Sequence, residues 1–189
     1  MKRREWLQGV LAASVWSALA GRSGAARAQA KDMKRITELQ KNWRTYMAEG
    51  YKAPLPTEPL QLSKDEWRKR LSAGAYNVLR EEGTERAGTS PLNGEKRDGI
   101  FACAGCDLPL FTSAMKYESG TGWPSFFTTI PGVFETKTDY HLFLPRIEYH
   151  CKRCGGHHGH VFDDGPQPTG QRWCNNGVAL KFVPKSGKA

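Results

Sequence analysis

The chain has 189 residues, five cysteines and a formal net charge of +9. It contains no repeats and no low-complexity tracts, and part of its positive charge lies in the first thirty residues. The charge that remains is too weak to indicate a nucleic-acid partner, so none is expected. The length suits one domain with a substantial core behind a leader segment.

The first thirty residues have the anatomy of an export signal. A basic start with Arg3 and Arg4 is followed by an apolar stretch from Gly9 to Gly21 and by the small residues of ARAQA. This stretch is shorter than the roughly 20 residues that span a bilayer, which predicts a signal peptide cleaved after Ala30 and no stable membrane insertion afterwards. The arginine pair resembles a bacterial twin-arginine signal, and an ordinary secretory signal is the alternative. Both predict a periplasmic or otherwise exported protein.

The segment 31–62 is predicted to hold one packing helix and a linker. Apolar residues recur at helical spacing as far as Gly50, namely Ile36, Leu39, Trp43 and Met47. The following YKAPLPTEPLQ contains three prolines and is predicted to be extended.

A second helix is predicted from Lys64 to about Glu82. Ser63 stands three residues before Glu66, which is the spacing of a capping box. Gly83 follows the last helical position, where glycine commonly ends helices.

Beyond Gly99 the pattern changes to short strands. The apolar runs GIFAC, VFETK, HLFLPRIEYHC, GHVFD and VALKFV alternate with glycine, proline and aspartate turns. No long helical pattern interrupts them. We therefore predict a mainly antiparallel β core with helices on its N-terminal side.

Four of the five cysteines form two CxxC pairs, Cys103 with Cys106 and Cys151 with Cys154. In an exported protein, two disulfides and one free thiol are a reasonable alternative. The two-residue spacing instead favours a structural zinc site with four cysteine ligands. Zinc would protect these thiols and leave Cys174 open to redox chemistry.

Three further stretches carry candidate functional side chains. Trp123 lies between a glycine and a proline, where an aromatic residue is by itself more often part of a core. The histidines of GGHHGH could be metal ligands, acid or base groups, or turn residues, although four cysteines already complete a tetrahedral zinc shell. Cys174 in RWCNNG is flanked by polar residues and glycine, which argues against a simple core role.

Taken together, these motifs resemble the methionine-R-sulfoxide reductase (MsrB) family. The matching stretches are GTER (83–86), CAGCDLPLF (103–111), SGTGWPSF (119–126), CKRCGGHHGHVFDDGPQPTG (151–170) and RWCNNGVALKF (172–182). The resemblance covers 63–184 as a catalytic domain and leaves 185–189 as a tail. It implies a mainly β fold of two antiparallel sheets with N-terminal helices and a structural zinc ion.

The resemblance also implies a role for each matching residue. Cys174 would be the nucleophile that attacks the sulfoxide sulfur and becomes a sulfenic acid. Trp123, His157, His160 and Asn176 would bind the substrate, with Trp123 receiving its methyl group and the others surrounding its oxygen. The implied substrates are oxidised proteins or peptides, and the implied role is repair after oxidative damage.

Two departures from the commoner family pattern affect this expectation. Many members carry a resolving cysteine at the position of Thr121, so this chain is expected to need an external thiol such as a thioredoxin-like dithiol. The stretch DYHLFLPRIE contains serine and glycine in the commoner pattern, whereas His141 and Phe143 stand here and are expected to affect pocket shape or substrate preference. Arg146 and Glu148 in the same stretch match the family.

Two other classes of function remain open at this stage. A zinc-stabilised binding module would explain the CxxC pairs but not the combination of Trp123, the histidines and Cys174. A zinc hydrolase would need an open coordination position, which four cysteine ligands do not leave.

Overall fold

The computed structural model describes residues 27–140 and 145–186. Within this part, the boundary between two compact units falls between Glu38 and Leu39. A helix occupies 27–41 and therefore runs through Ala30, whereas residues 1–26 of the predicted signal lie outside the described part, as do His141 and Phe143. In the part that is described, no helix is both long enough and apolar enough to cross a membrane.

The N-terminal helix is shorter than the sequence pattern predicts. It ends at 41 and is followed by the 3-10 helix η1 (Trp43–Tyr46), and Met47 already has an extended backbone. The hydroxyl of Thr45 donates to the carbonyl of Asn42 at 2.9 Å, a local contact that competes with continued α-helical bonding.

The proline-rich segment after Gly50 is irregular and turns where the N–H of Glu58 donates to the carbonyl of Leu55 at 3.2 Å, so it is not extended throughout as predicted. It is tied to both CxxC loops. The hydroxyl of Tyr51 donates to the carbonyl of Asp107 at 2.6 Å, just after the first cysteine pair. The backbone N–H of Leu60 donates to the carbonyl of Arg153 at 2.8 Å, within the second pair. This segment is therefore part of the packed structure.

The single helix predicted for 64–82 is wrong, because two helices stand there: α2 (Lys64–Arg70) and α3 (Ala73–Glu81). The Ser63–Glu66 capping box is confirmed at the start of α2. The break falls at Ser72, whose side chain accepts a hydrogen bond from the N–H of Ala75 and so begins a new helix. A serine that caps in this way ends one helix by starting the next.

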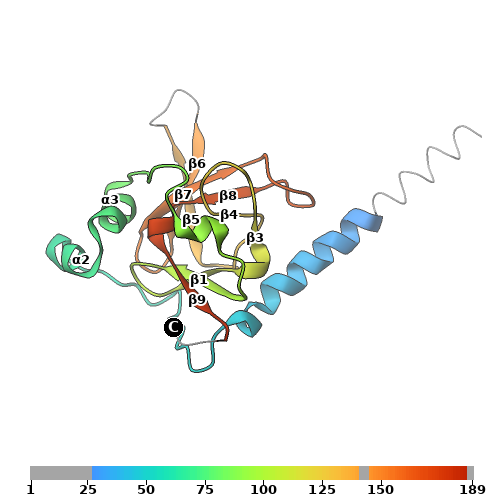
Figure 1. The fold of residues 1–189 in the computed structure, drawn as a ribbon, viewed down its shortest axis with the longest axis horizontal. Coiled ribbons are helices and arrows are strands. Elements are labelled where there is room, and N and C mark those ends of the chain that lie inside the picture. Colours follow the sequence, from blue (N-terminus) through green and yellow to red (C-terminus); the bar gives the residue numbers. More distant parts are fainter. Residues whose placement is uncertain (1–26, 141–144, 187–189) are drawn as a thin grey trace, which may run out of the picture. The chain divides into compact units, whose positions relative to one another are not determined.

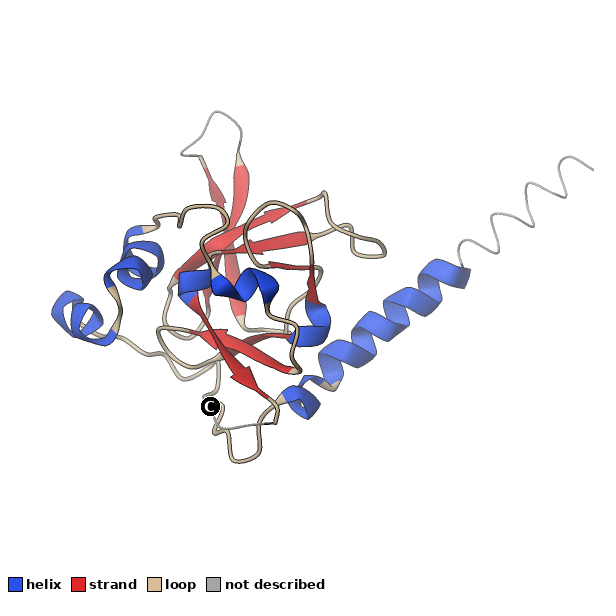
Figure 2. Ribbon diagram, in the orientation of Figure 1, coloured by secondary structure: helices blue, strands red, loops and turns tan. Residues whose placement is uncertain are grey.

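The mainly β fold of two antiparallel sheets is confirmed (Figures 1 and 2). The three-stranded sheet has the order β2-β1-β9, and the six-stranded sheet has the order β3-β4-β8-β7-β6-β5. The strands are β1 (Gly99–Cys103), β2 (Pro109–Thr112), β3 (Lys116–Tyr117), β4 (Ser125–Phe126), β5 (Phe134–Asp139), β6 (Arg146–Cys151), β7 (His157–Phe162), β8 (Arg172–Asn175) and β9 (Leu180–Pro184). The 3-10 helix η2 (Pro91–Gly94) lies between α3 and β1, η3 (Ser113–Met115) connects β2 to β3, and η4 (Gly177–Ala179) connects β8 to β9.

Aromatic side chains join the two sheets. Phe101 on β1 and Phe111 on β2 both contact the ring of Phe126 on β4, with ring centroids 5.1 Å and 3.9 Å away. All three rings are fully buried. Burial of each such side chain contributes about 1.5–3 kcal/mol, so this cluster is a main source of the attraction between the sheets.

Candidate active site and metal centre

One row of directly paired residues crosses the whole six-stranded sheet. In strand order it consists of Lys137, Glu148, His160, Cys174, Ser125 and Tyr117. Directly paired residues on neighbouring strands project from the same face of a sheet. The register therefore places the only cysteine outside the CxxC pairs beside a histidine.

A bulge in β7 brings a second histidine to this face. The pairing of β6 with β7 shifts after Tyr149, so that His150 faces His157 and His158 is the extra residue. Residues three apart on a regular strand point to opposite faces, but this extra residue reverses the alternation. The rings of His157 and His160 consequently lie on one side, with centroids 5.5 Å apart.

His158 belongs to the core and not to the site. It is fully buried, and its ring lies against Phe134 and Tyr149 at centroid distances of 5.7 Å and 6.4 Å. Burial lowers the pKa of His158 to about 3. The ring is therefore neutral at physiological pH.

Cys174 opens into a cavity of about 120 Å³. Trp123, His160 and Asn176 also line it, together with Arg146 and Phe162 from neighbouring strands and others. The backbone carbonyl of Cys174 is held from the core side by the hydroxyl of Tyr149 at 3.0 Å. Three of the four predicted substrate-binding residues thus surround the predicted nucleophile.

His157, the fourth predicted substrate-binding residue, lines an adjoining hollow of about 250 Å³. Four carboxylate residues line it as well, namely Glu81, Glu82, Asp139 and Glu148. Thr84, Arg146 and His160 border both spaces and therefore lie at the boundary between an apolar cavity and an acidic one.

Carboxylates orient both site histidines. Nε2 of His160 lies 2.8 Å from Oδ2 of Asp139, and Nη2 of Arg146 contacts the same oxygen at 2.6 Å. Nδ1 of His157 contacts Oε1 of Glu148, and Nε2 of this buried ring has no hydrogen-bond partner among the described residues. Burial lowers the pKa of each histidine, and the neighbouring carboxylate opposes that shift.

Asn176 and Trp123 are both fixed to the backbone of Glu85. The indole N–H of Trp123 donates to the carbonyl of Glu85 at 3.1 Å. Oδ1 of Asn176 accepts from the N–H of Glu85 at 2.9 Å, and its Nδ2 donates to the carbonyl of His158 at 3.0 Å. Asn176 therefore holds the backbone at Glu85, whose carbonyl in turn accepts the hydrogen bond from Trp123.

Glu85 itself is a residue that the sequence analysis did not select. Its carboxylate accepts hydrogen bonds from the backbone N–H groups of Gly177 and Val178 at 2.5 Å and 3.0 Å. It thereby joins the GTER segment to the start of η4, just after β8. In the sequence, the only indication of a role for Glu85 is that it lies in GTER, one of the stretches that match the family.

Burial raises the pKa of the Cys174 thiol. The positive charge of Arg172 and hydrogen bonding by Thr121 oppose this shift. Asp164 holds the Arg172 guanidinium through two contacts of 2.7 Å and 2.9 Å. The hydroxyl of Thr121 is itself 2.9 Å from the hydroxyl of Ser119. Cys174 is accordingly a thiol until a further interaction stabilises its anion.

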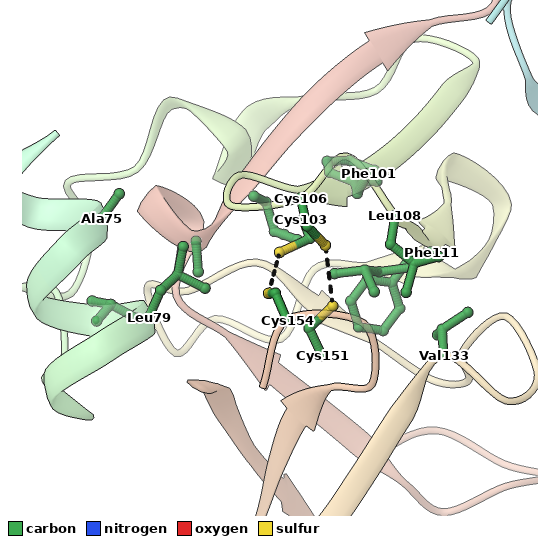
Figure 3. Packing of buried hydrophobic residues seen from close by; sticks show 14 of the residues in the cluster. Ala75, Leu79, Phe101, Cys103, Cys106, Leu108, Phe111, Val133, Cys151 and Cys154 are labelled. Carbon is green, nitrogen blue, oxygen red and sulfur yellow. Dashed lines mark hydrogen bonds between the residues drawn. The ribbon is translucent and has the colours of Figure 1, made fainter. Parts of the chain in front are cut away.

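The remaining four cysteines gather into one buried cluster (Figure 3). Sγ of Cys103 lies 3.7 Å from Sγ of Cys154, and the corresponding distance from Cys106 to Cys151 is 3.5 Å. A tetrahedral ion with bonds of about 2.3 Å separates its sulfur ligands by about 3.8 Å. The four thiols therefore fit a metal ion, and none of them forms a disulfide in the described chain.

The two CxxC loops have matching backbone conformations. Asp107 and Gly155, which directly follow the second cysteine of each pair, both have a φ of 67°. Each donates its N–H to the carbonyl of the first cysteine in its pair, at 2.9 Å and 2.8 Å. Only the second loop uses glycine for this left-handed position. Such paired turns direct both sulfurs of a loop toward one point.

Arginine side chains surround the cysteine loops. Arg80 and Arg153 donate to the carbonyls of Cys154 and Cys106 at 3.0 Å and 2.9 Å, and Arg70 donates to Gly105 at 2.6 Å. A divalent ion with four thiolates carries a net negative charge. Three guanidinium groups close to these loops suit such a charge.

Comparison with known proteins agrees with this geometry. A model of the SelR domain matches residues 71–184. Peptide methionine sulfoxide reductase B1, chloroplastic, of Arabidopsis thaliana is 50% identical over 122 residues, covering 64% of this chain and 60% of the relative. Peptide methionine sulfoxide reductase MsrB of Methanosarcina barkeri is 48% identical, covering 65% and 87%, and that of Pseudomonas putida is 48% identical, covering 65% and 93%. The match thus spans about 60% of the length of the plant relative.

Proposed function

Because the chain belongs to the SelR-domain (MsrB) family of peptide methionine sulfoxide reductases, we propose that it reduces methionine-R-sulfoxide in proteins or peptides to methionine. The observation that carries this proposal is the pairing of Cys174 with His160 at a cavity that Trp123 also lines. A thiol, an imidazole and an indole at one small cavity match the sulfur, oxygen and methyl group of this substrate.

The proposed reaction begins with the Cys174 thiolate. Its sulfur attacks the sulfoxide sulfur and forms a sulfur–sulfur bond while the oxygen takes up a proton. The substrate's sulfur–oxygen bond and the new sulfur–sulfur bond then break as the oxygen bonds to the Cys174 sulfur. Methionine gains two electrons and Cys174 becomes a sulfenic acid. His160, held by Asp139, is positioned to donate a proton to the departing oxygen.

The epimer preference follows from the two sides of the cavity. Trp123 offers an apolar surface to the methyl group, while His160 and Arg146 offer donors to the oxygen. The S epimer exchanges these two groups and would direct its oxygen toward the indole. An oxygen without a hydrogen-bond partner is costly in a small cavity.

Recycling is proposed to depend on an external thiol. The side chain at the common resolving position is Thr121, and the other four thiols belong to the buried cluster. Two thiol groups of a thioredoxin-like dithiol would reduce the sulfenic acid, releasing water and forming a disulfide on the reductant.

We further propose one structural zinc ion per chain, held by Cys103, Cys106, Cys151 and Cys154. Cysteine thiolates in a four-sulfur set are characteristic zinc ligands, and the sulfur separations suit that ion. Zinc would cross-link the two loops and supply no step of the reaction.

Export is proposed from the basic and apolar pattern of residues 1–21, with twin-arginine transport as the expected route. Lysine in place of both Arg3 and Arg4 should then leave the protein uncleaved in the cytoplasm. N-terminal sequencing of exported material tests cleavage after Ala30. Unchanged export of the double variant would instead indicate the general secretory route.

The function is tested by measuring the reduction of each purified sulfoxide epimer in a peptide with dithiothreitol as reductant. We expect turnover of the R epimer to exceed that of the S epimer by at least a hundredfold. The variant Cys174→Ser should be inactive yet retain its zinc. Equal rates on both epimers, or an active serine variant, would refute the proposal.

A further inference from the structure

We propose that Glu148, His150 and His157 form a second metal-binding site, for a divalent transition ion such as Zn²⁺, Co²⁺ or Ni²⁺. Their three donor atoms lie within 4.8 Å of one another. No atom of this site belongs to the four-cysteine cluster, and no residue of it supplies sulfur. The two sites therefore differ in their chemistry as well as in their residues.

The strand register assembles this site. Glu148 and His150 are two residues apart on β6 and so project from one face. The bulge in β7 makes His157 the cross-strand partner of His150. Oε1 of Glu148 lies 2.7 Å from Nε2 of His150 and also contacts Nδ1 of His157, so both rings converge on one carboxylate oxygen.

Two imidazoles and a carboxylate are a characteristic ligand set for zinc and neighbouring transition metals. Bonds of about 2.0–2.2 Å at tetrahedral angles separate such donors by about 3.4 Å. The observed 2.7 Å between Glu148 and His150 must therefore lengthen by about 0.7 Å, which small side-chain rotations achieve. Glu82 Oε1, 3.9 Å from Nε2 of His150, is placed to supply a fourth ligand.

The local charge favours a cation. Lys137 lies 2.7 Å from Oε1 of Glu82 and 3.2 Å from Oε2 of Glu148, so one ammonium group faces two carboxylates. This contact leaves Oε1 of Glu148 directed at the histidines. One ammonium group neutralises only one of the two carboxylates, so one negative charge remains. A divalent ion would compensate that charge, which hydrogen bonds alone do not.

Access is limited to one side. Glu148 and His157 are each only 2% exposed, whereas the side chain of His150 is 16% exposed and borders the exposed Glu82. His150 is thus both a ligand and the edge of the site. It is also the ligand best suited to replacement, since it lines neither the cavity of Cys174 nor the adjoining hollow.

The proposal is tested with full-length protein that carries no histidine tag and has its four-cysteine site loaded with one equivalent of Zn²⁺. Co²⁺ is then titrated while its d–d absorption is recorded, and the bound metal is counted after equilibrium dialysis. We expect one further equivalent with bands of a nitrogen and oxygen site and no thiolate charge-transfer band. The variant His150→Gln should bind this equivalent at least tenfold more weakly.

The matched control is Glu81→Gln, which removes a carboxylate from the same hollow without removing a proposed ligand. Its Co²⁺ affinity should stay within about twofold of that of the original chain. Absence of a second equivalent, an unchanged affinity in His150→Gln, or a thiolate band that assigns the cobalt to cysteine would each overturn the proposal. The cobalt absorption and the metal count do not depend on reductase activity. They therefore test the second metal site even if the proposed function is wrong.

Discussion

His160 and Cys174 are direct cross-strand partners in the pairing of β7 with β8. The imidazole is therefore positioned beside the thiol by backbone hydrogen bonding, and Asp139 then fixes its ring at 2.8 Å. A group held in this way loses little conformational freedom when the substrate arrives, which favours proton transfer.

Replacing Asp139 with asparagine tests the role of this carboxylate. Asp139 raises the pKa of His160 against the effect of burial, so Asp139→Asn should lower that pKa further. A smaller fraction of His160 is then protonated at a given pH. The alkaline limb of the pH–activity profile should therefore shift to lower pH. We expect kcat/KM for the R epimer to fall by roughly 10- to 100-fold. Asp163→Asn, at an exposed position, is the control, and an unchanged pH profile in Asp139→Asn would exclude the proposed role.

Thr121 is expected to affect the ionisation of the nucleophile. Its hydrogen bonding lowers the pKa of Cys174, so Thr121→Val should raise that pKa and reduce the thiolate fraction at neutral pH. Alkylation by iodoacetamide, followed against pH by mass spectrometry, should then be slower by up to about tenfold. Thr136→Val, at an exposed position on β5, should react at the original rate. Faster alkylation of Thr121→Val would contradict this account.

Removal of the metal should destabilise the whole domain. Cys103 ends β1 and Cys151 ends β6, while Cys106 and Cys154 lie in the turns that follow these strands. A metal ion held by the four would therefore join the two sheets. We expect Cys106→Ser to lower stability by on the order of 5 kcal/mol and Tm by roughly 10–20 °C. Differential scanning calorimetry with metal analysis measures both. Cys174→Ser should keep its Tm and metal content, and similar melting of both variants would count against a structural ion.

His158 is expected to make the fold sensitive to acid. Its pKa is about 3 in the folded protein because of burial, whereas an exposed histidine has a pKa near 6.5. The unfolded chain therefore binds more protons between these values, and stability falls as the pH drops below about 6.5. At pH 5 this loss is about 2 kcal/mol, and His158→Leu should abolish it. Urea unfolding of both proteins at pH 7.5 and pH 5 measures the difference, and an equal loss in both would disprove it.

The sequence predicted those features that depend on short spacings. The two CxxC pairs and the Ser63–Glu66 capping box each involve residues three apart, and both are present in the structure. The helix predicted for 64–82 failed because Ser72 is compatible with a helical pattern but caps a new helix instead. Whether Ser72 caps a helix depends on the rotamer of its own side chain. The spacing of hydrophobic residues carries no information about that rotamer.

The site was predictable in its residues and not in its geometry. The resemblance supplied Trp123 and Cys174, whereas Asp139 lies in none of the matching stretches and precedes its partner His160 by 21 residues. Glu85 was visible only as part of GTER. The division of the histidines between site and core depends on a bulge, which arises from strand pairing over a long sequence distance.

Because of that bulge, the site depends on the number of residues in β7 as well as on which residues they are. Deleting a single residue between His157 and His160 would restore regular alternation and turn the His157 ring toward the sheet's apolar side. The same deletion would leave Glu148 without one of its two imidazoles. A substitution at His158 changes one side chain, whereas deletion of His158 changes the face of the sheet on which His157 lies. Grafting this site onto another β-sheet would therefore require copying the insertion itself along with the chosen side chains.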